Sequence, residues 1–189
     1  MVIKCYNEKH TYLLFLDLEF NNQELIQFSG LLFKWIDTDT YQLDRSYTVY
    51  IAKKVCYPFA EYTAITNNFL QENGVPLEDA RAGIMEDFLN NVPLDETLMI
   101  SHGLKNDRIV LDRAGIRINT YGENNAPVDG YCTFTNARRI LKRKNQLTLG
   151  DLAEECGYYL HNAHNAYNDV WAEVAVFTYL KKKEVEREF

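Results

Sequence analysis

The sequence predicts an α/β fold in which a sheet of mixed strand direction carries helices on its faces. Three apolar runs near the start of the chain have the β-branched and aromatic composition of strands, and short connections between them favour antiparallel hairpins. Segments with helical spacing then alternate with one more short apolar run, an order typical of a layered α/β domain. Residues 11–20 are apolar at almost every position, so we expect this strand to lie in the middle of the sheet.

The individual elements follow from local patterns. Strands are predicted at residues 11–20, 24–36, 45–53 and 97–101. Helices are predicted at residues 64–71, 77–89, 107–114, 133–142, 148–156 and 166–181. Pro76 precedes the second helix, and Asn165 is a candidate N-cap for the last, whose apolar stripe includes Val170 and Phe177. Residues 119–130 have turn composition and are predicted to form a loop.

Length and composition bound the class of protein. A chain of 189 residues with 47% hydrophobic and 25% charged residues is large enough to form one domain with its own core. We therefore expect a single domain over residues 1–189, with its core at about 11–181. No run of about 18 apolar residues is present, so neither a transmembrane helix nor a membrane partner is expected.

Charge and cysteine usage narrow the class further. The N-terminal residues lack the apolar core of a secretory signal, and the four cysteines form no CxxC pair. Four isolated cysteines in a chain without such a signal favour a reducing, cytoplasmic location. The net charge of −7 argues against a protein that grips nucleic acid mainly through a basic surface. It is compatible with an enzyme that carries an acidic metal site.

Four acids lie at unusual or suggestive positions. Asp17 and Glu19 lie in the first predicted strand, where a spacing of two places both side chains on one face, roughly 7 Å apart. Burying unpaired carboxylates is costly, so the two acids either converge on a ligand or follow the end of the strand and are solvated. Asp107 and Asp169 each lie at the start of a predicted helix, where the helix dipole alone can explain an acid. The set of four is more informative than any member.

Two of the four histidines lie in the stretch HNAHNAYND, residues 161–169. If Asn165 caps the last helix, His164 lies in the loop just before it, and its ring could turn back toward Asp169. His161 lies three residues earlier and has no fixed geometry relative to this acid. The spacing favours His164, with a solvated loop histidine as the alternative.

These motifs together resemble the DEDDh family of 3′→5′ exonucleases, which includes the proofreading epsilon subunit of bacterial DNA polymerase III. The first motif is LFLDLEF, the second is SHGLKNDRIVL and the third is HNAYND. They contain Asp17, Glu19, Asp107, His164 and Asp169. His161 does not fit the third motif, because the acid required five residues later would fall on Ala166. The resemblance covers about residues 13–180.

The resemblance implies a ribonuclease H-like fold, with a mixed five-stranded sheet and helices on both faces. It also implies a metal-dependent 3′→5′ exonuclease, with DNA favoured as substrate, that releases nucleoside 5′-monophosphates by a two-metal mechanism. Asp17, Glu19, Asp107 and Asp169 would hold two Mg²⁺ or Mn²⁺ ions, hard cations that prefer oxygen ligands. His164 would take a proton from the attacking water as general base.

The chain departs from the family at positions that flank the substrate. Phe20 stands where the family usually has Thr, and Gly103 and Asn106 replace the usual Asn and aromatic residue of the second motif. The candidate substrate contacts are Phe20, His102, Arg138 and Arg139. The two arginines belong to the basic run ARRILKRKNQ, residues 137–146, for which a solvated helix face is the alternative.

Two alternatives to a DNA exonuclease stay open. Relatives that trim RNA 3′ ends share the same five residues, and 2′-hydroxyl contacts cannot be identified in the sequence. A non-catalytic nucleic-acid-binding module of a larger complex is the second alternative, although such a module has no physical reason to keep four repelling acids. The expected partners are the 3′ ends of single-stranded DNA or RNA, and a polymerase or another nucleic-acid enzyme is the protein partner to consider.

Overall fold

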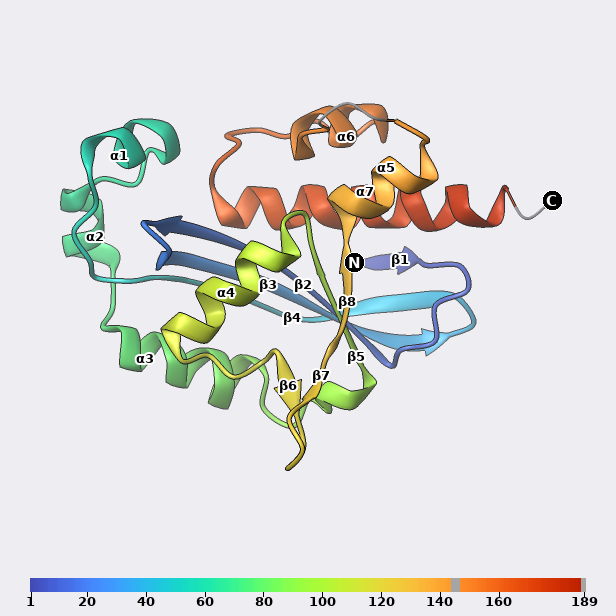
Figure 1. Cartoon of the computed structure of the whole chain (residues 1–189), viewed down its shortest axis with the longest axis horizontal. Coiled ribbons are helices and arrows are strands. Elements are labelled where there is room, and N and C mark those ends of the chain that lie inside the picture. Colours follow the sequence, from blue (N-terminus) through green and yellow to red (C-terminus); the bar gives the residue numbers. More distant parts are fainter. Residues whose placement is uncertain (144–146, 188–189) are drawn as a thin grey trace.

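The computed structural model describes residues 1–143 and 147–187 and contains, within them, a six-stranded sheet between two layers of helices (Figure 1). The strand order is β1-β4-β3-β2-β5-β8. The strands are β1 (Val2–Lys4), β2 (Tyr12–Asn21), β3 (Glu24–Asp37), β4 (Thr40–Tyr50), β5 (Thr97–Ser101) and β8 (Asp129–Cys132). A separate ribbon pairs β6 (Thr120–Tyr121) with β7 (Ala126–Pro127).

Strand direction is mixed, as predicted. Each of the neighbouring pairs β1–β4, β4–β3 and β3–β2 is antiparallel, whereas β5 runs parallel to β2, and β8 runs parallel to β5. The turn between β2 and β3 uses Asn22 and Gln23, both with positive φ, which produces the expected hairpin. β2 has neighbours on both sides, which confirms the central place expected from its apolar sequence.

Helices cover both faces of the sheet, which confirms the predicted fold class. The helical segments are α1 (Tyr57–Thr63), α2 (Asn67–Asn73), α3 (Leu77–Ala82), the π-helical η1 (Gly83–Phe88), the 3₁₀ turn η2 (Leu94–Glu96), α4 (Leu104–Ala114), α5 (Thr133–Ile140), α6 (Leu149–Glu155) and α7 (Ala166–Val185). α7 packs on one face, with α5 and α6 against it, and α3, η1 and α4 cover the other (Figure 1). Among the residues described, no helix has both the length and the apolarity that a membrane crossing requires.

Alternation along β2 sorts its side chains between the two faces. Leu14, Leu16 and Leu18 pack against the layer formed by α4 and η1, whereas Leu13 and Phe15 pack against α7. Phe15 and Phe177 of α7 meet edge to face, with ring centroids 5.4 Å apart. The same alternation places the two acids of β2 on the face covered by α7.

Two regions of the sheet differ from the prediction. β1 is a sixth strand, and it forms because residues 2–4 pair with the edge of β4, which no local periodicity indicates. The predicted loop at 119–130 contains β6, β7 and the first part of β8, and β8 is ordered by parallel pairing with β5. Gly130 permits this arrangement, because a Cβ atom there would lie 2.6 Å from Leu104 Cδ2 in α4.

Helix boundaries also differ from the prediction in the segment before β5. The predicted helix at 64–71 corresponds to α2 alone, which begins at Asn67 because Ala64 adopts φ 60° at the end of α1 and Thr66 then caps α2. The sequence did not predict α1. The predicted helix at 77–89 is α3 followed by the π-helical η1. Such π segments often occur near functional sites, but η1 packs in the core against β3 and β4.

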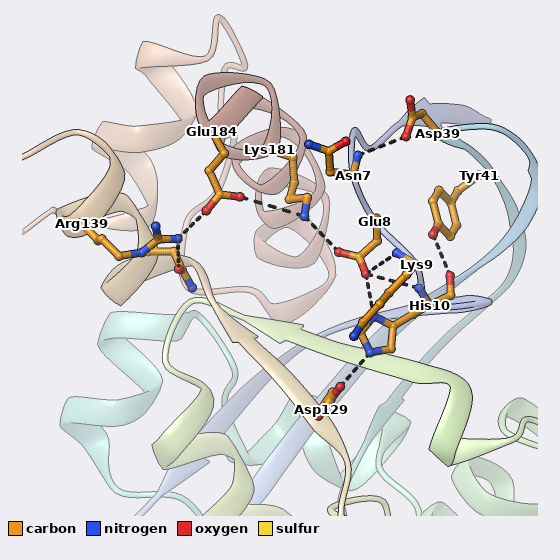
Figure 2. A network of polar contacts seen from close by, with 11 residues as sticks. Asn7, Glu8, Lys9, His10, Asp39, Tyr41, Asp129, Arg139, Lys181 and Glu184 are labelled. Carbon is orange, nitrogen blue, oxygen red and sulfur yellow. Dashed lines mark hydrogen bonds and ion pairs between the residues drawn. The ribbon is translucent and has the colours of Figure 1, made fainter. Parts of the chain in front are cut away.

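A polar network joins the loop after β1 to α7 and β8 (Figure 2). The Glu8 side chain is only 6% exposed, and it accepts a hydrogen bond from Lys181 Nζ at 3.1 Å. Glu8 Oε1 also lies 2.5 Å from His10 Nδ1, and His10 Nε2 lies 3.0 Å from Asp129 Oδ2. The network therefore fastens the C-terminal half of α7 to the edge of the sheet.

Candidate active site

β3 fixes the start of α7 beside the acids of β2. Asp17 and Glu19 lie near the end of β2, and Gln27 of β3 pairs with Glu19 across the ladder. Gln27 is fully buried, and its Oε1 accepts a hydrogen bond from the backbone N of Ala166 at 3.1 Å. Its Nε2 donates to Asn165 Oδ1 at 3.4 Å. The first turn of α7 is thereby held over the end of β2.

Asp169 lies in that first turn. Asn165 caps α7 as predicted, since its Oδ1 accepts from the backbone N of Tyr167 at 3.1 Å. Asp169 is buried, and its Oδ2 accepts a hydrogen bond from the backbone N of His164 at 2.9 Å. Its Oδ1 is also buried and has no hydrogen-bond partner among the described residues.

Three carboxylates from β2 and α7 converge on one point. Asp17, Glu19 and Asp169 each offer an oxygen, and these oxygens lie within 4.8 Å of one another. Asp107, in the first turn of α4, is outside this close triad and is buried. Its Oδ2 accepts a hydrogen bond from Ser101 Oγ at the end of β5. The four acids thus come from three separate elements.

The cluster holds more negative charge than the metal-free fold favours. Burial, and then the charges of Asp107, Asp169 and Glu19, raise the pKa of Asp17 well above its ordinary value. Burial, and then the charges of Asp169 and Asp107, raise the pKa of Glu19 to about 7. Burial also raises the pKa of Asp107 and of Asp169 to about 6, although one hydrogen bond to each lowers it.

This set of donors fits a hard divalent cation. All the donors in the triad are carboxylate oxygens, the ligands that Mg²⁺ and Mn²⁺ prefer. Asp169 Oδ1 is buried without a partner, and coordination would supply one. A bound cation would also offset the repulsion that, after burial, raises the pKa values of Asp17 and Glu19.

His164 lies beside the cluster in an arrangement that differs from the expected one. Its backbone adopts φ 67°, and its backbone N, rather than its ring, contacts Asp169. The ring stacks on Tyr62 of α1, with centroids 3.7 Å apart and planes inclined by 31°. Burial lowers the pKa of His164, which favours the neutral ring that a general base requires. His161 is exposed and packs against Tyr159.

Phe20 and His102, two of the predicted substrate contacts, have different surroundings. Phe20 lines a hollow of about 190 Å³ against α4; its other lining residues are Gln23, Asn106, Ile109 and Val110. The His102 ring has Nδ1 at 2.9 Å from Thr133 Oγ1 and Nε2 at 3.2 Å from the carbonyl oxygen of Leu147. Both nitrogens are engaged within the protein, so the ring anchors the β5–α4 turn to α5 and the segment before α6.

The structure does not bring Arg139 to the carboxylate cluster. It pairs with Glu184 near the far end of α7 (Figure 2). Glu184 follows Asp169 by 15 residues, which is about 22 Å of helix. Arg138 lies over the ring of Phe134 at 5.7 Å. Residues 144–146 of the same basic run lie outside the described residues.

The sequence motifs do not include Glu173, a fully buried acid of α7. Its Oε1 accepts a hydrogen bond from the backbone N of His102 at 2.7 Å, and its Oε2 has no partner among the described residues. Burial, and then the charges of Asp17 and Asp107, raise the pKa of Glu173 well above its ordinary value. The sequence signal for Glu173 is an acid four residues after Asp169, on the same side of the same helix.

Comparison with known proteins identifies the fold. No family model and no curated protein matches this chain in sequence. The nuclease domain of 3′hExo, a DEDDh family member bound to rAMP, matches with a TM-score of 0.69 and 11% identity, covering 92% of each chain. E. coli exonuclease I in complex with a dT13 oligonucleotide matches with a TM-score of 0.71 and 17% identity, over 94% of this chain and 42% of that one. Cell-death related nuclease 4 (CRN-4) matches with a TM-score of 0.66 and 14% identity, over 90% of this chain and 64% of that one.

Two of these matched proteins are longer than this chain. This chain spans less than two thirds of CRN-4 and less than half of exonuclease I, but nearly the whole 3′hExo nuclease domain. Sequence identities of this size establish the fold alone, and the specific likeness to a proofreading epsilon subunit stays a prediction. The chain has the ribonuclease H-like fold found in the nuclease domain of the DEDDh family member 3′hExo.

Proposed function

We propose that this protein is a metal-dependent 3′→5′ exonuclease that works as a single domain and releases nucleoside 5′-monophosphates from nucleic acid. The observation that carries the proposal is the convergence of Asp17, Glu19 and Asp169 within 4.8 Å, in a fold shared with nucleases. The 3′hExo structure holds rAMP, a nucleoside monophosphate of the proposed product class.

The proposed cofactor is a pair of Mg²⁺ or Mn²⁺ ions. Asp17, Glu19 and Asp169 would hold them, and Asp107, buried close by, would complete the set of ligands. When bound, the ions supply a lowered pKa for the attacking water and stabilisation of the leaving 3′ oxygen. Without them, Glu19, whose pKa is raised to about 7, is partly protonated at neutral pH.

The side chains of the protein would orient the substrate and move the proton. The neutral ring of His164, in the loop just before Asp169, would accept the proton of the attacking water. Phe20, which follows Glu19 in β2, offers an aromatic surface at the edge of the hollow against α4, where a terminal base would stack. Because both ring nitrogens of His102 are engaged, and Arg139 pairs with Glu184, we do not assign these two a substrate contact.

We take DNA as the favoured substrate and RNA as the alternative. The neighbours in structure include an exonuclease I bound to dT13 and a 3′-exonuclease that recognises a histone mRNA stem-loop. A non-catalytic binding module is disfavoured, because the buried, mutually repelling acids cost the fold stability that a bound cation would return. A polymerase or another nucleic-acid enzyme stays a predicted protein partner.

The test is an exonuclease assay on 5′-labelled single-stranded DNA and RNA of one sequence, with Mg²⁺, Mn²⁺ or EDTA. We expect a ladder that shortens from the 3′ end and disappears in EDTA or with Asp169→Ala. His164→Ala should slow the reaction by about 10²- to 10⁴-fold, whereas the matched control His161→Ala, in the same loop, should leave it unchanged. If the folded, metal-binding protein shortened neither strand, the binding module would become the better explanation.

A further inference from the structure

Glu173 is a fully buried acid to which the proposed chemistry gives no role. It lies one helical turn after Asp169 on α7, so both side chains project from the same side of the helix. A buried carboxyl group is costly unless its oxygens are satisfied. The contacts of Glu173 therefore indicate what this residue does.

One oxygen of Glu173 holds the turn that leads from β5 to α4. Its Oε1 accepts a hydrogen bond from the backbone N of His102, at 2.7 Å. In the same turn, Ser101 Oγ accepts from the backbone N of Gly103 at 3.1 Å and donates to Asp107 Oδ2. A short series of contacts thus connects α7 with the acid of α4.

This connection joins two layers that pack on opposite faces of the sheet. α4 belongs to the core on one face of the sheet, and the apolar side of α7 belongs to the core on the other (Figure 1). The cluster needs Asp107 from the first layer and Asp169 from the second. The His102 ring ties the turn to α5, and its backbone N ties the turn to α7 through Glu173.

We propose that Glu173 is a positioning residue, which holds the β5–α4 turn against α7 and thereby sets Asp107 in place relative to Asp17 and Asp169. The inference rests on the proposed function in one respect, which is that these acids are metal ligands. The hydrogen bond from His102 to Glu173 is the contact that performs this positioning.

Two conservative substitutions separate the hydrogen bond from the charge. Glu173→Gln keeps an oxygen at the same reach, so it can still accept from His102, but it removes the carboxylate. Glu173→Asp keeps the carboxyl group but is one methylene shorter, so the 2.7 Å contact is lost. Glu184→Gln is the matched control, because Glu184 is on the same helix, outside the cluster, and pairs with Arg139.

Two measurements on the full chain test the role. The first is the affinity for Mn²⁺, by titration calorimetry. The second is amide hydrogen exchange of residues 101–107 in the metal-free protein. We expect Glu173→Asp to weaken Mn²⁺ binding by about 10- to 100-fold, the range typical of residues that orient metal ligands, and to speed exchange in the turn. Glu173→Gln and Glu184→Gln should have a Mn²⁺ affinity and an amide exchange rate close to those of wild type.

Three results would overturn the proposal. The first is a Glu173→Asp variant with the Mn²⁺ affinity and the amide exchange of wild type. The second is a loss of Mn²⁺ affinity in Glu173→Gln equal to that in Glu173→Asp, which would assign the effect to the charge of Glu173. If the wild-type protein bound no Mn²⁺, the proposed function would fail, but exchange in the metal-free protein would still test the positioning role. Unchanged exchange in Glu173→Asp would then be the third contrary result.

Discussion

Asp107→Asn should stabilise the metal-free protein at alkaline pH, although it removes a proposed metal ligand. Asp107 is 6% exposed, and burial raises its pKa from 3.8 to about 6, even though the hydrogen bond from Ser101 lowers it. At pH 8 the folded chain must keep this group ionised near Asp17. Asparagine removes the charge and keeps an oxygen that can accept from Ser101.

The magnitude follows from the difference in pKa between the folded and unfolded chains. A carboxyl group with a pKa of about 6 when folded and 3.8 when unfolded binds its proton more tightly in the folded state, so the wild-type protein loses stability as pH rises between these values. Above pH 6 the loss reaches about 3 kcal/mol, at about 1.36 kcal/mol for each pKa unit. About 1 kcal/mol changes Tm by about 2–4 °C in a chain of this length. Asp107→Asn should therefore melt about 6–12 °C above wild type at pH 8 and close to wild type at pH 4.

Thermal melts followed by circular dichroism, in EDTA at pH 4, 6 and 8, would measure this difference. Asp95→Asn, at an exposed position outside the cluster, is the control and should melt like wild type throughout. A Tm difference that does not grow between pH 4 and pH 8 would refute the reasoning, as would a variant less stable than wild type at pH 8. Added Mn²⁺ should raise the Tm of wild type more than that of Asp107→Asn.

Three further predictions concern stability. Phe177→Ala should lower the free energy of unfolding in urea by about 3–5 kcal/mol, because its fully buried ring fills the core under α7. Asn165→Ala should lower the free energy of unfolding in urea by about 1 kcal/mol, because it removes the N-cap of α7. Lys181→Met should cost on the order of 1–3 kcal/mol at pH 7, because it leaves the carboxylate of Glu8 without its cation. Burial raises the pKa of Glu8, but the contacts with His10 and Lys181 outweigh burial and lower this pKa below 4.5. The stability lost in Lys181→Met should therefore diminish as pH falls below this value.

Two of the three variants, Phe177→Ala and Lys181→Met, have a matched control. Tyr159→Ala, at a position 77% exposed, should leave stability unchanged where Phe177→Ala does not. Lys183→Met is the control for Lys181→Met, because it removes a cation that pairs with Glu186 near the surface of α7. It should change the free energy of unfolding little. A cost for Lys181→Met that is equal at pH 3 and pH 7 would contradict the pairing with Glu8, and wild-type stability in Asn165→Ala would contradict the capping role.

The elements that could be predicted are those with strong local periodicity. β5 has the predicted bounds, and α7 has the predicted N-cap and apolar stripe. β1 and β8 could not be predicted, because their few residues become strands only by pairing with β4 and β5. The break between α1 and α2 depends on one residue, Ala64, in a left-handed conformation that alanine rarely adopts.

The candidate site divides in the same way. Asp17 and Glu19 share a face because side chains in any strand alternate with a period of two. The five residues in three ordered motifs predicted the fold that this chain shares with the 3′hExo nuclease domain. No local pattern indicates that the His164 ring stacks on Tyr62 in place of turning toward Asp169.

The sequence by itself determined the fold class, the central strand and the acids that make up the candidate site. Only the tertiary structure decided how those acids meet, that Arg139 lies far from them, and that Glu173 links α7 to the β5–α4 turn. The physical reason is that periodicity and capping act between residues a few positions apart. The contact between Glu173 and His102, in contrast, joins residues 71 positions apart and exists only once both layers have packed on the sheet.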